Sequence, residues 1–326
     1  MKPFAYVQPQ SIVEASQEAA RPDTIVKAAG IDVVDRMKER LLTPQRVVNL
    51  LPLHKAMGGI ADRDGELSIG ASVTLTDLAE HPALGIASRA GLRIAAATTA
   101  TPQIRHRATV AGNLLQFTRC WYVRSEAHSC LHGGRGPTCL AMTGDNRYHA
   151  VLGWQDCVRV HPSNLAPALL ALGAEYTTVL GDKTQRRPLA ALFPKDPRAE
   201  AQEHTLAPGE LVLAIHVPVQ PEGARSSYAE SRELLSHDWA TTACAARLVL
   251  QDGVIAAADL VLGAVAPNPL PRPEAAKFLV GKKPDDNLFV RVADLAYRGA
   301  APLSHNAYKL AVGKATVREA LTLCVQ

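Results

Sequence analysis

The pattern of hydrophobic and polar residues near the start of the chain predicts a strand, a turn and a helix in direct succession. Residues 24–28 (Thr-Ile-Val-Lys-Ala) are typical of a strand, and the small residues that follow predict a turn. From residue 32 to about residue 41, apolar side chains recur on one helical face. Such a unit points the free N–H groups of the helix toward a space where an anion can bind, although most units of this kind bind nothing.

The rest of the chain alternates between short strands and helices, with one long interruption. Expected strands are residues 43–53, 66–71, 175–180 and 210–217, and expected helices are residues 75–81, 86–100, 164–172, 287–298 and 305–322. Residues 245–263 predict a hairpin that turns at Asp252-Gly253, because this pair readily adopts the left-handed conformation of a tight turn. Between about residues 116 and 160 the pattern indicates a long loop instead.

Composition narrows the class of protein. The 326 residues predict two or three domains, and 47% hydrophobic with 20% charged residues indicates a folded chain. The net charge is only +4, aromatic residues make up 5%, and no basic block occurs, so a nucleic-acid partner is not expected. No run of 18 apolar residues predicts a membrane span, and the first residues do not resemble a secretory signal.

Cysteines are concentrated in the long loop. Four of the six fall within 38 residues: Cys120, Cys130, Cys139 and Cys157. Their wide spacing, among glycines and polar residues, favours a four-iron cluster over zinc, a disulfide or no site, and all four possibilities stay open on spacing alone. His128, His132 and His149 could replace a thiolate, but four cysteines already suffice. Cys244 and Cys324 are expected in the core.

Eight stretches, taken in order, resemble one family. They are residues 28–38, 69–71, 103–116, 118–120, 146–151, 161–163, 206–211 and 306–310. With them the chain resembles, over nearly its whole length, the FAD-binding (medium) subunits of the xanthine dehydrogenase family of molybdenum hydroxylases. The similarity is strongest to the flavin subunit of bacterial periplasmic aldehyde oxidoreductases that carry an additional four-iron cluster.

The resemblance implies an α+β fold. A two-part FAD-binding domain of the vanillyl-alcohol oxidase (PCMH) type would be followed by a smaller C-terminal α/β domain with an antiparallel sheet and helices. The expected boundaries are residues 1–54 and 55–220 for the two FAD-binding subdomains, with the iron–sulfur loop at 116–160, and 221–326 for the C-terminal domain.

The resemblance also implies the residues that hold each cofactor. The FAD pyrophosphate would lie on the backbone of the first small-residue turn, and the Thr-x-x-Gly-Asn segment would lie against the ribityl-phosphate region. The implied FAD-binding residues are Ile25, Val26, Lys27, Ala28, Ala29, Gly30, Ile31, Asp32, Val33, Thr109, Gly112, Asn113, Asn164 and Trp239. The implied ligands of a 4Fe-4S cluster are Cys120, Cys130, Cys139 and Cys157, and no catalytic residue is assigned.

Three positions depart from the usual pattern of the family. The usual Ala-Gly-Gly-Thr is Ala-Ala-Gly-Ile at residues 28–31, which lacks one glycine and one hydroxyl. The usual Pro-Ser-Asp ends in Asn164 here, and a lysine that is common near the start of the last domain is replaced by Glu230. The usual aromatic residue near the flavin is Trp239.

The function implied by the resemblance is electron transfer within a larger enzyme. A large molybdopterin-binding subunit would oxidise the substrate, a small 2Fe-2S subunit would relay electrons, and this chain would pass them through FAD to an external acceptor. Two alternative functions are a non-catalytic assembly subunit with a degenerate flavin site and a stand-alone flavin oxidase of the vanillyl-alcohol oxidase type. The expected location is the cytoplasm, or alternatively the periplasm after co-export with a signal-bearing partner.

Overall fold

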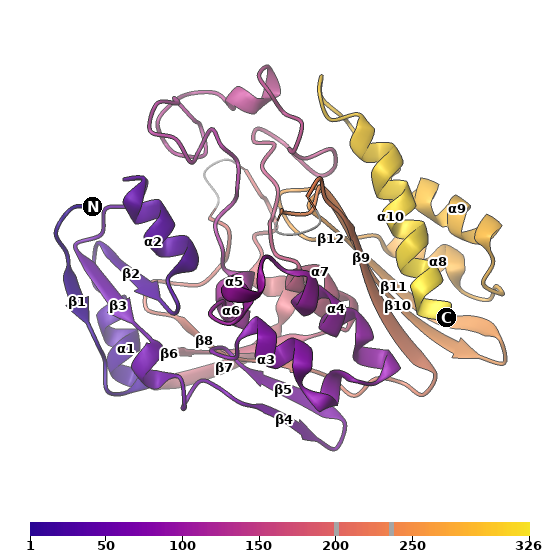
Figure 1. Ribbon diagram of the computed structural model, residues 1–326, viewed down its shortest axis with the longest axis horizontal. Coiled ribbons are helices and arrows are strands. Elements are labelled where there is room, and N and C mark those ends of the chain that lie inside the picture. Colours follow the sequence, from indigo (N-terminus) through magenta and orange to yellow (C-terminus); the bar gives the residue numbers. More distant parts are fainter. Residues whose placement is uncertain (199–201, 235–237) are drawn as a thin grey trace.

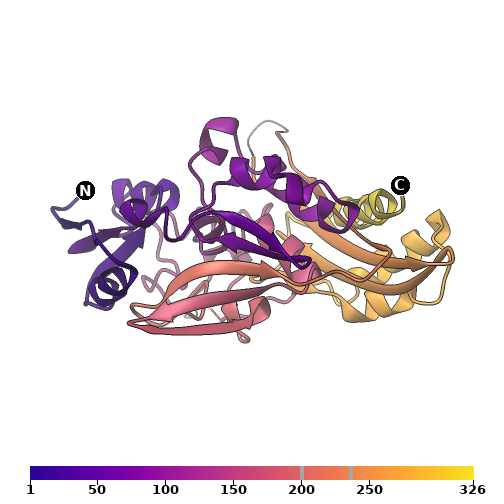
Figure 2. The ribbon, with the colours of Figure 1, turned by 90° about the horizontal axis from the view of Figure 1, so that it is seen from below.

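The computed structural model describes residues 1–198, 202–234 and 238–326 of the chain. Three sheets, each with its own helices, follow one another in the sequence and along the length of the molecule (Figures 1 and 2). The combination of separate helices with mainly antiparallel sheets confirms the expected α+β class. In the part of the chain that is described, no helix is both long enough and apolar enough to cross a bilayer.

The N-terminal unit is built on a parallel sheet in the order β1-β3-β2 (Ala5–Val7, Arg46–Asn49 and Thr24–Lys27). Helices α1 (Ile12–Ala19) and α2 (Ile31–Lys38) connect these strands, since parallel neighbours need a crossover. The strand–turn–helix unit expected from residue 24 onward is therefore confirmed. The strand expected at residues 43–53 is shorter, because the chain turns into the 3₁₀ helix η1 (Leu51–Leu53), which contains a proline.

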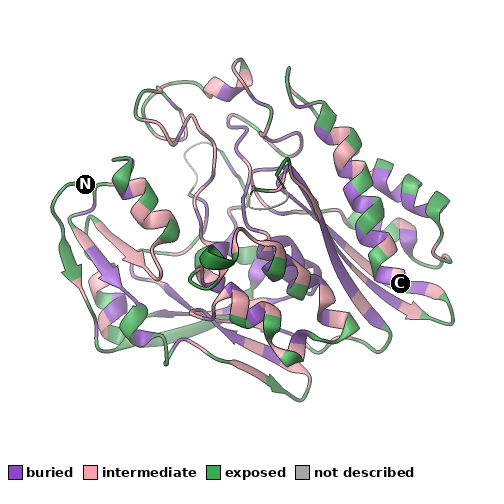
Figure 3. Ribbon diagram, viewed as in Figure 1, coloured by how far each residue is buried: buried purple, intermediate pink, exposed green. Residues whose placement is uncertain are grey.

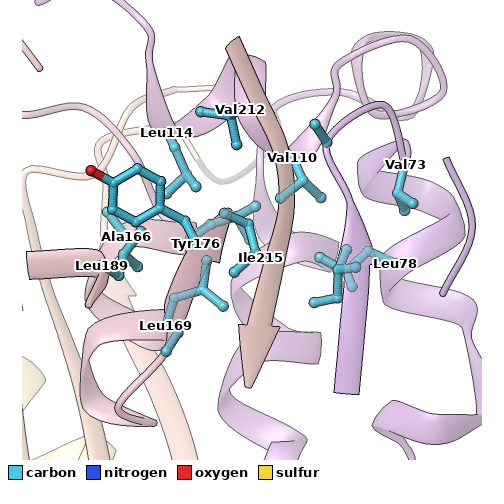
Figure 4. Close-up of a cluster of buried hydrophobic side chains, with 14 of the residues drawn as sticks. Val73, Leu78, Val110, Leu114, Ala166, Leu169, Tyr176, Leu189, Val212 and Ile215 are labelled. Atoms are coloured by element: carbon cyan, nitrogen blue, oxygen red, sulfur yellow. The ribbon is translucent and has the colours of Figure 1, made fainter. Parts of the chain in front are cut away.

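The middle unit is an antiparallel five-stranded sheet covered by helices. Its strands, in spatial order, are β4 (Ile60–Arg63), β5 (Glu66–Gly70), β8 (Leu211–Val217), β6 (Glu175–Leu180) and β7 (Lys183–Pro188). Its helices are α3 (Leu75–Glu80), α4 (Ala90–Thr98), α5 (Pro102–Arg105), α6 (Val110–Leu114) and α7 (Leu165–Ala171), with 3₁₀ helices η2 (Pro82–Leu84), η3 (Ala87–Arg89) and η5 (Leu189–Leu192). Apolar side chains of α3, α6 and α7 meet Tyr176 and Ile215 of the sheet in the main core (Figure 4).

The C-terminal unit is a second antiparallel sheet with three helices. Its strands run in the order β12 (Leu270–Pro271), β11 (Val254–Gly263), β10 (Thr242–Gln251) and β9 (Ala224–Ser231). Helices α8 (Pro273–Leu279), α9 (Asp286–Ala296) and α10 (Tyr308–Val325) cover one face, and the buried positions of β9 to β11 form its core (Figure 3). The expected hairpin is confirmed: Asp252 and Gly253 have φ values of 50° and 74°.

An irregular segment connects α6 to α7. Residues 115–164 contain no strand or α-helix and only the 3₁₀ helix η4 (Leu140–Met142); they form the long excursion at the top of Figure 1. We call residues 116–160 the cysteine loop. The expected domain boundaries fall between sheets, after η1 and between β8 and β9, and they stay predictions.

Candidate functional site

The turn between β2 and α2 ends at a helix N-terminus, where the first N–H groups have no acceptor within the helix. Gly30 is the residue that precedes α2, its φ of 87° lies in the left-handed region, and it offers no side chain to accept from the first turn of the helix. Ala29 does not take a positive φ, so the glycine missing from the usual family pattern is not needed for this backbone conformation. The helix N-terminus is therefore suited to an anion such as a phosphate.

Two positive charges face this turn from different elements. The Lys27 ammonium donates to the carbonyl of Ala28 and to Oδ1 of Asn49, both at 2.9 Å. Burial and the charge of Arg107 lower the pKa of Lys27. Arg107 lies just before Thr109 and its charge acts on Lys27, so the two segments expected to bind one cofactor approach each other and each carries a cation there.

The Thr109–Asn113 segment contributes its backbone, because its side chains are engaged elsewhere. The hydroxyl of Thr109 accepts from the N–H of Gly112 at 3.1 Å and starts α6. Asn113 is buried, and its Oδ1 accepts from the Ser163 hydroxyl at 2.6 Å and from the N–H of Leu165 at 3.3 Å. These contacts fix α6 against the start of α7. Gly112 itself is exposed.

Asp32 is also engaged within the protein. Its carboxylate accepts from the N–H of Phe117 at 3.0 Å and pairs with Arg119 at 3.1 Å and with Arg124 at 2.5 Å. Burial acts to raise the pKa of Asp32, but the two guanidiniums outweigh burial and hold this pKa below its ordinary value. Asp32 therefore binds the cysteine loop to α2 through its carboxylate, and only its backbone stays available for the expected contact with FAD, which stays a prediction.

Several residues expected to act separately meet in one pocket of about 340 Å³. Its walls include Cys120 of the cysteine loop, Asn164 at the start of α7, Tyr228 of β9, and Trp239 between β9 and β10. Trp239 is 50% exposed, and the guanidinium carbon of Arg119 lies 4.8 Å from the centroid of its ring. Burial and the nearby Arg124 lower the pKa of Arg119 to about 10, which leaves it charged at neutral pH. The pocket thus combines an aromatic surface with a fixed positive charge.

The four loop cysteines lie in one region as free thiols. The Cys157 thiol donates to the sulfur of Cys139, which lowers the pKa of Cys139 and raises that of Cys157. Burial raises the pKa of the Cys120 thiol to about 12, and the charges of Cys130 and Cys139 act in the same direction. Within residues 1–198, 202–234 and 238–326, no three Cys, His, Asp or Glu side chains have the arrangement of a metal site. Four free thiols are the ligands that an iron–sulfur cluster needs, but in this structure their sulfur atoms do not have the arrangement of a metal site.

Two of the three loop histidines have clear partners. Nε2 of His149 lies 3.1 Å from Sγ of Cys120, and Nε2 of His132 lies 3.1 Å from a carboxylate oxygen of Glu203. Cys244 and Cys324 are buried in the C-terminal core, as expected.

Sequence reasoning did not find several residues of the site. Arg107, Tyr228 and Arg119 owe their positions to the packing of elements far apart in the chain. Arg107 and Arg119 lie in stretches that resemble the family (residues 103–116 and 118–120), but neither stretch singled out its arginine as a site residue.

Comparison with known proteins settles the family. Residues 2–220 match the family described as the FAD binding domain in molybdopterin dehydrogenase, and residues 226–323 match the CO dehydrogenase flavoprotein C-terminal domain. The chain belongs to the FAD-binding, medium-subunit family of xanthine dehydrogenase and CO dehydrogenase. As a member of this family it is an oxidoreductase component, which confirms the resemblance read from the sequence.

Individual relatives span nearly the whole chain. The aldehyde oxidoreductase FAD-binding subunit PaoB of Escherichia coli is 33% identical, with 98% of each chain covered. The carbon monoxide dehydrogenase medium chain of Afipia carboxidovorans is 30% identical over 92% of this chain and 88% of its own. In fold, the chain is similar to a Cu,Mo-CO dehydrogenase (TM-score 0.76, 24% identity, 99% of both chains) and to quinoline 2-oxidoreductase of Pseudomonas putida 86 (TM-score 0.76, 23% identity, 100% and 99%).

Proposed function

We propose that this chain is the electron-transferring flavoprotein subunit of a molybdenum hydroxylase, and that it binds FAD with the pyrophosphate between its N-terminal and middle units and the ring system in the pocket that the C-terminal unit helps to form. The observation that carries the proposal is the pairing of a cationic helix-terminal turn with a separate aromatic pocket. A dinucleotide needs both, one for its pyrophosphate and one for its ring system. FAD, when bound, supplies a group that takes up two electrons and releases them singly or as a pair.

The residues fit this cofactor. The N–H groups at the start of α2, with Lys27 and Arg107, would hold the pyrophosphate, and the backbone at Thr109 and Gly112 would lie beside it. Trp239 would pack on the flavin ring, and Asn164 also lines the pocket. The half-exposed Trp239 would leave one edge of the ring open to an external electron acceptor.

We further propose that the cysteine loop binds a four-iron cluster through Cys120, Cys130, Cys139 and Cys157. The four thiols act electrostatically on one another, and no disulfide removes any of them. Cys120 also lines the candidate flavin pocket, so a cluster there would add a one-electron relay next to it. Forming the cluster would require the thiols to replace their present hydrogen bonds with bonds to iron.

We propose that the chain works with partners. The relatives named above are a FAD-binding subunit and a medium chain. A large molybdopterin-binding subunit and a small 2Fe-2S subunit would therefore supply the electrons.

The test is cofactor analysis of the complex purified without oxygen from its native host. We expect one FAD per copy of this chain and about four iron and four acid-labile sulfide beyond those of the partners. The variant Cys120→Ala should lose this additional iron, whereas the control Cys324→Ala, which removes a thiol from the C-terminal core, should keep it. Zinc in place of iron would overturn the cluster. A complex that assembles but releases no flavin on denaturation would overturn the flavoprotein and leave an assembly subunit.

A further inference from the structure

A buried carboxylate stands directly behind the wall of the candidate flavin pocket. Glu230 on β9 has a side chain only 5% exposed, and it pairs with Arg232, whose side chain is 7% exposed. One oxygen of Glu230 accepts from the Asn164 amide at 2.5 Å and from the Tyr228 hydroxyl at 2.9 Å. Three groups thus converge on one carboxylate, and a charged acceptor makes stronger hydrogen bonds than a neutral one.

Two of these partners belong to the pocket itself. Asn164 and Tyr228 line it, and so does Ala243, the residue that faces Glu230 across the β9–β10 pair. Glu230 does not line the pocket. It acts on the pocket only through the side chains that it holds.

Arg232 extends the network to the middle unit. Its guanidinium donates to the carbonyl of Thr98, at the end of α4, at 2.6 Å. The network therefore connects β9 of the C-terminal unit with α4 and the start of α7. A substitution at Glu230 would therefore alter contacts between the middle and C-terminal units, beside the pocket that they form.

Two of the sequence departures noted above meet here and match each other. An aspartate at position 164 would place its carboxylate in contact with that of Glu230. The amide of Asn164 donates to Glu230 instead. The two replacements form one compatible donor–acceptor pair, with Arg232 neutralising the buried charge.

We propose that Glu230 is a positioning residue for the flavin: it holds Asn164 and Tyr228 in the pocket wall and, together with Arg232, keeps the net charge behind that wall close to zero. This inference rests on the proposed function, because it requires FAD in the pocket. It assigns Glu230 and Arg232 opposite electrostatic effects on the bound flavin, a relation that a purely structural role would not produce.

The experiment compares Glu230→Gln with Arg232→Gln in the purified complex, using the midpoint potential of the flavin and the dissociation constant for FAD. Glu230→Gln leaves Arg232 unopposed and should shift the potential to more positive values, since reduced flavin carries more negative charge. Arg232→Gln leaves Glu230 unopposed and should shift it to more negative values. Glu230→Gln should also bind FAD about tenfold more weakly, because a neutral amide holds the wall side chains less strongly than a carboxylate does. Arg232→Gln keeps the carboxylate and should change FAD affinity less.

Exchanging the amide and the carboxylate between positions 164 and 230 provides the second test. Asn164→Asp alone should cost the most FAD affinity, because it places two carboxylates together. The double variant Asn164→Asp/Glu230→Gln restores a donor and an acceptor and should recover most of that loss. The control Asp259→Asn removes a carboxylate from a partly exposed ion pair with Arg247, farther along the same sheet and outside the Glu230 network, and should change neither quantity.

The outcomes separate the inference from the function on which it rests. Shifts of the potential in the same direction, or no shift in either variant, would overturn the role of Glu230 while FAD binding stands. If Glu230→Gln does not fold, a swap variant that folds but gains nothing over Asn164→Asp would overturn it equally. A wild-type complex without flavin would overturn the proposed function and this inference with it.

Discussion

Replacing Asp32 with asparagine should weaken the attachment of the cysteine loop to the N-terminal unit. The carboxylate lies 3.1 Å from Arg119 and 2.5 Å from Arg124, and the side chain of Asp32 is 15% exposed. The two arginine side chains are 18% and 13% exposed, so water screens these pairs only weakly. Asparagine keeps the shape and one acceptor for the N–H of Phe117, but it removes the charge that both guanidiniums require.

The size of the effect follows from burial. Breaking a buried ion pair costs about 3–5 kcal/mol, and an exposed pair contributes about 0–1 kcal/mol. Asp32 lies nearer the buried limit, while asparagine retains one neutral hydrogen bond, so we expect a loss of about 2–3 kcal/mol in the free energy of unfolding.

The same helix offers a matched control. Asp35 pairs with Arg124 at 2.9 Å but its side chain is 53% exposed, so Asp35→Asn should cost less than about 1 kcal/mol. Urea denaturation followed by circular dichroism at pH 7 measures both differences. Equal losses for the two variants would refute the assignment of Asp32 as the buried anchor of the loop.

The pH dependence of this loss has a definite sign. Arg119 and Arg124 outweigh burial and hold the pKa of Asp32 below its ordinary value in the folded chain. Such a carboxyl contributes stability above its unfolded pKa, about 3.9, and this contribution is lost as the pH falls through the folded pKa. The difference between the wild-type protein and Asp32→Asn should therefore narrow below about pH 4.

Three further substitutions test other parts of the fold and the site. Burial lowers the pKa of His161 to about 4, so the unfolded chain binds a proton before the folded chain does as the pH falls. The wild-type protein should therefore lose up to about 3 kcal/mol of stability through this group between pH 6.5 and 4. In His161→Asn this loss should be absent, as measured by unfolding at a series of pH values. At Gly30 (φ 87°) an added Cβ would lie 3.0 Å from a side-chain carbon of Val34, so Gly30→Ala should lower the stability by about 1–2 kcal/mol and weaken FAD binding. The control Gly181→Ala (φ 63°, no atom within 4 Å of the added Cβ) should lower the stability by a similar amount and leave the FAD affinity, measured by flavin titration, unchanged. The buried ammonium of Lys309 donates to three backbone carbonyls, so Lys309→Met should lower the thermal midpoint by the equivalent of about 3 kcal/mol, and Lys314→Met, on the exposed side of the same helix, should barely change it.

The sequence by itself determined the elements whose cause is local. The β2–turn–α2 unit follows from an apolar strand, small residues and an amphipathic helix, and the β10–β11 hairpin follows from an Asp-Gly pair that adopts positive φ without help from other elements. Strand β7 was missed because its residues are polar and mostly exposed, so its pairing with β6 leaves no hydrophobic pattern to read. Its backbone hydrogen bonds depend on a neighbour, which a local pattern cannot show.

The tertiary structure alone decided how the candidate site is assembled. The sequence gives no partner for the Asp32 side chain; folding places Arg119 and Arg124, which lie 87 and 92 positions away, against its carboxylate. Asn164 and Glu230 looked like two separate departures from a family pattern, and only the approach of residue 164, just before α7, to β9 shows that they form one hydrogen-bonded pair. The identity of a side chain determines which bonds it is able to make. Which partner it contacts depends on how distant elements pack, because a buried polar group has no access to water and must bond to the donors and acceptors that the fold places next to it.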